Sequence, residues 1–158
     1  MAVNFQQVGF TYQPGTPFAT PGLHDVNFTI PDGQITAVIG HTGSGKSTMV
    51  QHLDGLVIPT TGKIQHGDML IEPGMKPKAL NKLRAHVGLV FQFPEAQLFE
   101  QTVLKDVMFG PKNFGKTDAE AKESAQAALR LVGMSEQFDE HSPFELSGGQ
   151  MRRVAIAG

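Results

Sequence analysis

The chain has 158 residues, with 13 Lys and Arg against 15 Asp and Glu, a formal net charge of −2 and no cysteine. This length suits one domain, and the slightly acidic balance offers no basic surface for a nucleic-acid backbone. The absence of cysteine excludes a disulfide scaffold, a thiolate metal site and a thiol nucleophile, and it fits a reducing cytosol. No apolar stretch approaches the roughly 20 residues of a membrane-spanning helix, and no signal peptide is predicted.

The N-terminal part predicts a small sheet followed by a buried strand. Alternating apolar residues over 2–8 and 26–30 indicate half-buried antiparallel strands. The stretch 11–22 between them is rich in proline and glycine, which predicts an exposed loop with Tyr12 at its entrance. The run 35–39 is apolar without alternation, as expected of a parallel strand covered on both faces.

A glycine-rich turn after this run leads into a predicted helix over 46–53. A strand, a glycine turn and a helix therefore follow one another in order. Further along, weaker patterns predict two short strands within 62–71, a short basic helix over 78–85 and a second buried strand over 87–91.

The character of the sequence becomes helical after residue 92. Residues 102–110 predict one helix, and Thr117 with Glu120 forms a capping box that opens another, with Gly133 as its natural end. Small and apolar residues share one stripe of this second helix: Ala121, Ala125, Ala128 and Val132. The pattern over 92–144 predicts a mainly helical insert on an α/β core.

The turn Gly40–Ser47 matches the phosphate-binding pattern G-x-x-x-x-G-K-[ST]. Its glycines let backbone N–H groups turn inward around an anion, and the helix N-terminus adds partial positive charge. Lys46 would bridge the β- and γ-phosphates, and the Ser47 hydroxyl would ligate Mg²⁺. A turn that merely links strand to helix is the alternative, but the strand before and the helix after are the context that the motif requires.

The histidines show no spacing typical of metal ligands. We expect five of them to be surface or satisfied polar residues: His24, His52, His66, His86 and His141. His41 lies inside the phosphate loop, which binds through its backbone, so its side chain receives no chemical role.

A second glycine-bearing helix start, Leu146–Gln150, reads LSGGQ and places Ser147 100 residues after Ser47. Its two glycines free the backbone and Ser147 supplies a hydroxyl, which predicts a second anion-binding helix N-terminus. An ordinary N-cap serine is the alternative. Together with the phosphate loop, the motif favours the anion site.

With these two motifs the sequence resembles the nucleotide-binding subunits of ATP-binding-cassette (ABC) transporters along its whole length. The resemblance implies that Tyr12 stacks on adenine, that Gly40–Thr48 is the Walker A loop, that Gln92 is the Q-loop glutamine and that Leu146–Gln150 is the signature. In this family two subunits pack head to tail, so each ATP lies between the Walker A loop of one and the signature of the other. Hydrolysis then opens the dimer and moves a membrane partner.

The resemblance carries a set of site residues, with ATP and Mg²⁺ as cofactors. Lys46 and Gln92 are the implied catalytic residues, and Ser47 and Gln92 the implied Mg²⁺ ligands. The implied nucleotide contacts within one subunit are Tyr12, Gly40, His41, Thr42, Gly43, Ser44, Gly45, Lys46, Ser47 and Thr48. Those implied across the dimer are Ser147, Gly148, Gly149 and Gln150.

The resemblance also implies a fold and a domain plan. The fold is an α/β P-loop NTPase of ABC type, with a parallel-sheet core, an N-terminal antiparallel β subdomain and a mainly helical insert. Residues 1–91 would form the β subdomain and P-loop core, 92–144 the Q-loop and helical insert, and 145–158 the signature and the start of its helix.

The segment 90–107 is similar to the energy-coupling-factor (ECF) branch of the family, whose ATPases drive uptake of vitamins and of metals such as cobalt and nickel. The phosphate loop and the loop 12–17 resemble the second of its two ATPase subunits. The implied partners are a second ABC ATPase, a transmembrane coupling protein and a substrate-binding membrane protein, and the implied place is the cytoplasmic face of the membrane. Apolar residues of the segment suit either a groove for a coupling helix or a core under the helical insert: Phe93, Leu98 and Phe99.

The family continues past the signature helix to a Walker B strand ending in Asp-Glu and to a switch histidine. The Asp139–Glu140 pair follows no apolar strand and precedes the signature, so we reject it as catalytic. We expect the 158 residues to be the N-terminal part of a longer subunit, with exposed sheet edges, weak nucleotide binding and hardly any hydrolysis on their own.

Other functions remain open at this point. An ABC protein of DNA repair would place a long coiled coil between the motifs, for which the spacing leaves no room. An ABC translation factor, the ATPase of another ABC importer and a non-catalytic nucleotide-binding module are further alternatives. P-loop kinases and GTPases fit least, because nothing in them requires LSGGQ.

Overall fold

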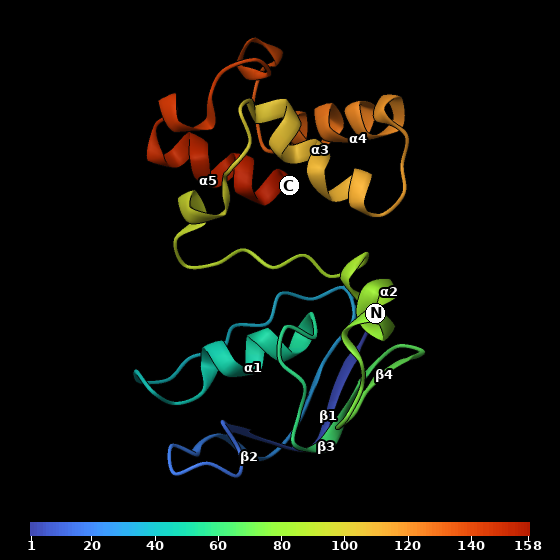
Figure 1. Cartoon of the computed structure of the whole chain (residues 1–158), viewed down its shortest axis with the longest axis vertical. Helices are drawn as coiled ribbons and strands as arrows, with labels where there is room; N and C mark the ends of the chain where they lie inside the picture. Colours follow the sequence, from blue (N-terminus) through green and yellow to red (C-terminus); the bar gives the residue numbers. More distant parts are fainter. The chain divides into compact units, whose positions relative to one another are not determined.

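The computed structural model describes the backbone of residues 1–158 and all side chains except those of Pro77 and Glu95. The chain forms two compact units, Met1–Leu89 and Val90–Gly158. The first unit holds the strands and the second is helical, as the colours of Figure 1 show.

The first unit contains a four-stranded sheet in which every pairing is antiparallel, in the order β2-β1-β3-β4. Its strands are β1 (Val3–Tyr12), β2 (Thr20–Ile30), β3 (Thr61–His66) and β4 (Met69–Ile71). The two N-terminal strands and the two short strands within 62–71 are therefore confirmed.

One face of this sheet is covered by helices. Phe5 pairs with Phe28 on β2 and with Ile64 on β3, and its ring stacks on Phe28 at a centroid distance of 4.5 Å. The helical elements of the unit are α1 (Lys46–Leu53), η1 (Pro77–Leu80) and α2 (Asn81–Arg84). They add Met49, Leu80 and Leu83 to the same buried cluster, so burial of apolar surface fixes α1 against the sheet.

The predicted loop 11–22 is shorter than expected. Residues 11 and 12 end β1 and residues 20–22 begin β2, with Tyr12 opposite Thr20. The prediction rested on proline content, but β2 is an edge strand, where a missing N–H such as that of Pro21 is tolerated.

The two predicted parallel strands, 35–39 and 87–91, do not form in this structure. Both runs are irregular, and Ile35 and Ile39 are 103% and 90% exposed. A strand is stable where a neighbour completes its hydrogen bonds, and the described residues place no strand beside either run. The antiparallel sheet is thus the predicted N-terminal β subdomain, whereas the strands predicted for the parallel-sheet core do not form among the described residues.

The second unit is a cluster of helices. Its elements are η2 (Pro94–Gln97), α3 (Val103–Asn113), α4 (Asp118–Leu131), η3 (Glu136–Phe138), η4 (Pro143–Glu145) and α5 (Gly148–Ala157). Their shared core is Leu98, Val103, Leu104, Val107, Ala125, Leu129, Met134, Leu146, Val154 and Ala155. The helical insert is confirmed, and α5 packs with η2, α3 and α4 in the same unit.

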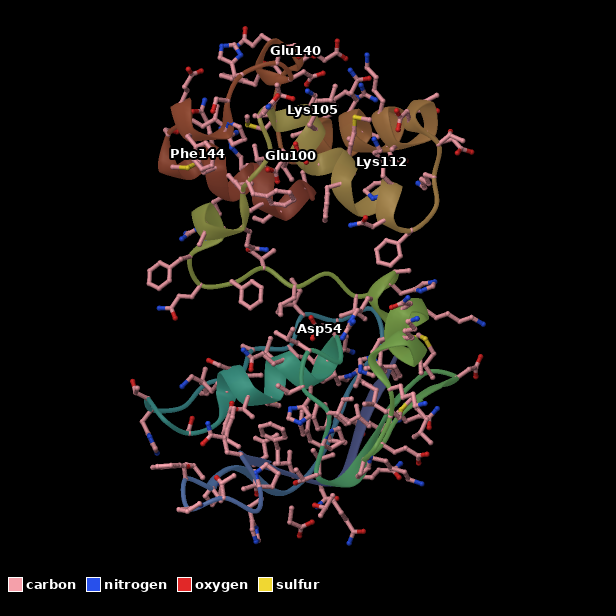
Figure 2. All side chains as sticks on the ribbon, in the orientation of Figure 1. Asp54, Glu100, Lys105, Lys112, Glu140 and Phe144 are labelled. Carbon is pink, nitrogen blue, oxygen red and sulfur yellow. The ribbon has the colours of Figure 1, made fainter. Side chains whose placement is uncertain are left out.

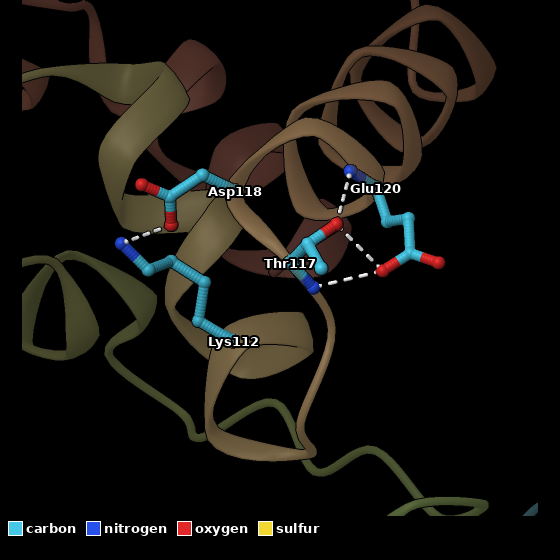
Figure 3. Close-up of polar contacts among 4 residues, drawn as sticks. All are labelled: Lys112, Thr117, Asp118 and Glu120. Carbon is cyan, nitrogen blue, oxygen red and sulfur yellow. Dashed lines mark hydrogen bonds and ion pairs between the residues drawn. The ribbon is translucent and has the colours of Figure 1, made fainter.

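Side-chain caps set the helix starts of this unit. The Thr117 hydroxyl accepts from the Glu120 N–H while the Glu120 carboxylate accepts from the Thr117 N–H at 2.8 Å, which is the predicted capping box (Figure 3). The same figure shows Lys112 paired with Asp118 at 2.8 Å. Gly133, with φ +71°, ends the turn after α4 as expected. Among the described residues, none of the helices is long and apolar enough to cross a membrane.

Candidate functional site

The phosphate loop closes on its own lysine. The Lys46 ammonium donates to the carbonyl oxygens of Gly40 at 2.8 Å and His41 at 2.7 Å. Helix α1 begins behind it with Gly45 as its N-cap, in the left-handed conformation and without a side-chain cap. The first N–H groups of α1 are therefore left to an external acceptor, next to a cation.

Two glycines of this loop are required by space or by backbone conformation. Gly43 has φ +83°, a left-handed conformation that a side chain would strain. Gly45 has φ +87°, and a Cβ there would lie 2.8 Å from the carbonyl oxygen of Gly22. The tight turn thus depends on residues without side chains.

Tyr12 lies against the first turn of α1. Its hydroxyl and the Thr48 hydroxyl are 2.8 Å apart, and its ring meets Phe10 edge to face at 4.8 Å. The ring is 40% exposed. The structure thus brings Tyr12 together with the Walker A residues, while its stacking on adenine stays a prediction.

His52 and His66 are buried in this unit, against the prediction that they are surface or satisfied residues. His52 Nδ1 bonds to the Thr48 carbonyl at 2.7 Å, but its Nε2 and both ring nitrogens of His66 have no partner in the described structure. Burial lowers the pKa of both imidazoles. The residues described contain no group of three or more His, Asp or Glu arranged for a metal.

An apolar cavity of about 510 Å³ lies beside the loop. It is bounded by Leu23, Val26 and Phe28 of β2, by residues 36–40 and by α1. The loop forms one wall of this cavity through Gly40, Ser44, Gly45 and Lys46, and the opposite walls are hydrocarbon.

The second unit holds the LSGGQ motif at the start of α5. The Ser147 N–H donates to the Gln150 side-chain oxygen at 2.8 Å, and the Ser147 hydroxyl accepts from the Gln150 N–H at 3.4 Å. Gly148 and Gly149 both lie inside α5 with ordinary backbone angles, and a Cβ on either would meet nothing within 4 Å. The packing of this unit therefore gives no reason for glycine at either position.

Gln92 is exposed and lies just inside the second unit. Two residues later η2 begins, which packs on α5. The phosphate loop belongs to the first unit and the signature to the second, so the structure brings together the predicted residues within each group only.

The apolar residues after Gln92 divide between the two predicted roles. Leu98 is buried in the core of the second unit, as the core alternative expects. Phe93 and Phe99 are 63% and 57% exposed, and Phe99 meets Phe109 edge to face at 4.8 Å. This segment therefore contributes to the core through one residue and to the surface through the others.

A second cavity of about 510 Å³ lies along α3 in this unit. Charged side chains of both signs surround it (Figure 2): Glu100, Lys105, Lys112 and Glu140. Its carboxylates disfavour a phosphate ligand. Asp139, the neighbour of Glu140, is buried and accepts from the Gln126 amide at 2.9 Å, which makes it a link between α4 and the following turn.

Comparison with known proteins decides what these motifs belong to. A family model described as ABC transporter matches residues 23–158. The chain belongs to the ABC transporter family. Two curated relatives named energy-coupling factor transporter ATP-binding protein EcfA2, from Lactiplantibacillus plantarum and Enterococcus faecalis, are each 60% identical over the full 158 residues. The chain spans about half the length of these relatives, 54% and 55%.

Solved structures agree with this family. The ATP-binding cassette MJ0796, in a dimeric post-hydrolysis state bound to ADP and Pi, is 31% identical with a TM-score of 0.84. That match covers 98% of this chain and 67% of the other. CbiO1 from Clostridium perfringens, part of the ABC transporter complex cbiONQ, is 33% identical with a TM-score of 0.80 over 98% and 59% of the two chains. The predicted ABC-type fold and the resemblance to the ECF branch are confirmed.

Sequence reasoning missed the support behind Tyr12. Phe10 meets the Tyr12 ring edge to face, and His52 bonds to the Thr48 carbonyl and meets Phe10. Gly22 lies so close that a Cβ there would collide with Tyr12. Gly22 was visible only as one more glycine of a predicted loop. The strand pairing that brings it against α1 depends on contacts distant in sequence.

Proposed function

We propose that the chain binds ATP as part of an ATPase subunit that powers uptake of a small solute, of the vitamin or transition-metal class, through an ECF-type transporter. The curated relatives named as ECF transporter ATP-binding proteins support this assignment. The dimeric cassette bound to ADP and Pi supports hydrolysis of ATP as the reaction.

The observation that carries the proposal is the pair of glycines at the start of α5. Glycine inside a helix costs roughly 0.5–1 kcal/mol relative to alanine, and neither Gly148 nor Gly149 relieves a contact within its unit. The absence of side chains at these two positions therefore lets a ligand from outside the unit approach the backbone. A phosphate that reaches the first turn of α5 needs that access.

Two phosphate-binding elements on one chain favour a site shared between two subunits. Lys46 and the uncapped start of α1 would hold the β- and γ-phosphates of one nucleotide. The start of α5, with Ser147, would face the γ-phosphate held by a partner. Loss of that phosphate on hydrolysis removes the attraction between the two subunits, so closure and opening follow the nucleotide state.

Mg²⁺ fits the residues at the start of α1. The Ser47 side chain is exposed and makes no hydrogen bond to the described residues, so its hydroxyl can serve as an oxygen ligand of Mg²⁺. Gln92 is a second proposed ligand on the resemblance alone. The ion would neutralise charge on the terminal phosphates. Lys46 would bind the same phosphates through its ammonium, and Tyr12, which is bonded to Thr48 of α1, would hold the base.

The wider assembly follows from the same proposal. The partners are a second, homologous ABC ATPase, a transmembrane coupling protein and a substrate-binding membrane protein, at the cytoplasmic face of the membrane. The named relatives and the cbiONQ neighbour support this arrangement.

The test compares Lys46→Ala with Ser147→Arg in the native protein. We expect Lys46→Ala to abolish tight ATP binding, and Ser147→Arg to keep ATP binding while it blocks ATP-dependent association and hydrolysis. A Ser147→Arg variant that still associates and turns over would contradict the shared site.

A second experiment tests the transport role. Purification of the native protein from membranes should bring a second ATPase and a transmembrane protein with it. Recovery as a monomer bound to ribosomes or nucleic acid would favour a non-transport ABC protein, and nucleotide binding without turnover would favour a non-catalytic module.

A further inference from the structure

Four side chains join β1 to the helix behind the phosphate loop in a closed chain of contacts. Tyr12 bonds to the Thr48 hydroxyl, and the Thr48 carbonyl bonds to His52 Nδ1. The His52 ring meets Phe10 edge to face at 5.0 Å, and Phe10 meets Tyr12 at 4.8 Å. We call this set, Phe10, Tyr12, Thr48 and His52, the tyrosine bracket.

The backbone of β2 lies close against the tyrosine bracket at Gly22. A Cβ at this position would lie 2.8 Å from Cε2 of Tyr12 and 3.2 Å from both Cδ1 of Phe10 and Cγ2 of Thr48. The φ of Gly22 is not positive, so space and not backbone conformation requires glycine. The strand thus holds the Tyr12 ring against α1 at the closest distance that the chain allows.

The bracket fixes the ring at its polar end and leaves the rest accessible. Thr48 is 7% exposed and lies in the first turn of α1, next to Ser47, whereas Tyr12 is 40% exposed. A ring whose hydroxyl is anchored cannot swing about its Cα–Cβ bond without breaking a hydrogen bond. Its accessible surface therefore keeps one place relative to the phosphate loop.

We propose that the Tyr12 hydroxyl is a positioning group, which through Thr48 sets the base-binding ring in register with the phosphate loop. This inference rests on the proposed function and adds to it. The distance between the base and the phosphates of a nucleotide is limited by its sugar and phosphoester linkages, so the two contacts form together most readily if ring and loop are held at a matching separation. Without the anchor, binding of the base must also order the ring, and an immobilised side chain of this kind weakens binding by roughly threefold to tenfold.

The test separates the base from the phosphates. Affinities for ATP and for inorganic tripolyphosphate are measured in the native protein and in Tyr12→Phe, which keeps the ring and loses the hydroxyl. We expect Tyr12→Phe to weaken ATP binding about threefold to tenfold and to leave tripolyphosphate binding unchanged. A purely structural defect in the loop would weaken both ligands alike and would overturn the proposal.

A double-mutant cycle with Thr48→Val shows whether the hydroxyl acts through Thr48. Tyr12→Phe should cost no further ATP affinity in the Thr48→Val background, and Thr48→Ser, which keeps the partner hydroxyl, should restore the cost. If Tyr12→Phe costs as much beside Thr48→Val as beside Thr48, the hydroxyl acts elsewhere and the proposal fails.

Gly22→Ala offers a variant that leaves both hydroxyls in place. Its methyl group would displace the ring, so we expect the same selective loss of ATP affinity. Unchanged ATP affinity in both Gly22→Ala and Tyr12→Phe would overturn the positioning role.

A spectroscopic readout is available because Tyr12 is the single tyrosine of the 158 residues and there is no tryptophan. ATP should change the tyrosine fluorescence of this chain and tripolyphosphate should leave it unchanged. An equal response to both ligands would contradict a role for the ring in holding the base. Failure of the unmodified protein to bind either ligand would instead sink the proposed function itself.

Discussion

The starts of α1 and α5 differ in what satisfies their first backbone N–H groups. At α1 the N-cap is Gly45, which offers no side chain, and the nearest charge is the Lys46 ammonium. At α5 Ser147 and Gln150 satisfy each other's N–H groups in a complete capping box. The first helix start needs an external acceptor, whereas the second is stable alone.

The glycines of the phosphate loop and those at the start of α5 also differ in whether their own unit requires them. Gly43 and Gly45 are required by the fold of their unit, because both have positive φ and a side chain would strain the backbone. Gly148 and Gly149 are open to solvent and strain nothing. This contrast fits the proposed function, in which one motif binds its ligand within one chain and the other faces a ligand held by a second molecule.

Removal of the lysine should have the largest effect. Lys46→Ala deletes a cation whose charge-assisted bonds to phosphate are worth about 1.5–3 kcal/mol each, so ATP affinity should fall roughly 100-fold, as isothermal titration calorimetry would show. Lys105→Ala, on α3 of the other unit, is the control and should bind ATP normally. A small loss with Lys46→Ala would place the phosphates elsewhere.

Gly45→Ala should lower the free energy of unfolding of the first unit. An alanine at a left-handed position costs roughly 1–2 kcal/mol, and the close carbonyl of Gly22 adds to this cost. Denaturant unfolding followed by circular dichroism measures the change. Unaltered stability would show that the loop can relax, and would weaken the contrast with α5.

Acid should destabilise the first unit before the second. Burial holds the pKa of His66 and His52 below the value of about 6.5 in an unfolded chain. Their contribution to stability is therefore complete above pH 6.5 or so and is lost as the pH falls, by up to about 1.4 kcal/mol per pH unit for each histidine. Hydrogen exchange of the two units at successive pH values measures this, and His66→Leu should flatten the response. An equal loss in both units would argue against the histidines.

Gly149→Ala should have the smallest effect on folding stability, and it should raise stability where the preceding changes lower it. We expect a gain of roughly 0.5–1 kcal/mol in stability, because alanine favours the helix and finds open space. The same variant should lose ATP-dependent association of the native protein. Stability and association that both fall would mean that the glycine serves the fold after all.

Local patterns in the sequence predicted the capping box and the helix after the glycine-rich turn correctly. The capping box at Thr117 and Glu120 and the helix after Lys46 depend on neighbours within a few residues, and both form as expected. The run 35–39 does not form a strand because no described strand lies beside it, and apolar content alone does not supply hydrogen bonds.

Prediction of the candidate site was likewise limited to contacts between residues close in sequence. The residue types of the phosphate loop and of LSGGQ were readable from spacing, since each motif is contiguous. The bond between Tyr12 and Thr48 joins positions 36 residues apart and needs the bare backbone at Gly22 to form. A sequence pattern holds no record of that approach, which depends on how β2 crosses α1.

The bonds from the Lys46 ammonium to two carbonyl oxygens of its own loop have a thermodynamic consequence. A triphosphate bound here would replace these carbonyl oxygens as the acceptor of the ammonium N–H groups, so binding would exchange acceptors and not add new bonds. The net affinity for a triphosphate would then be smaller than the sum of the individual contacts suggests. Within the chain, the same two bonds tie the loop at residues 40 and 41 to the start of α1.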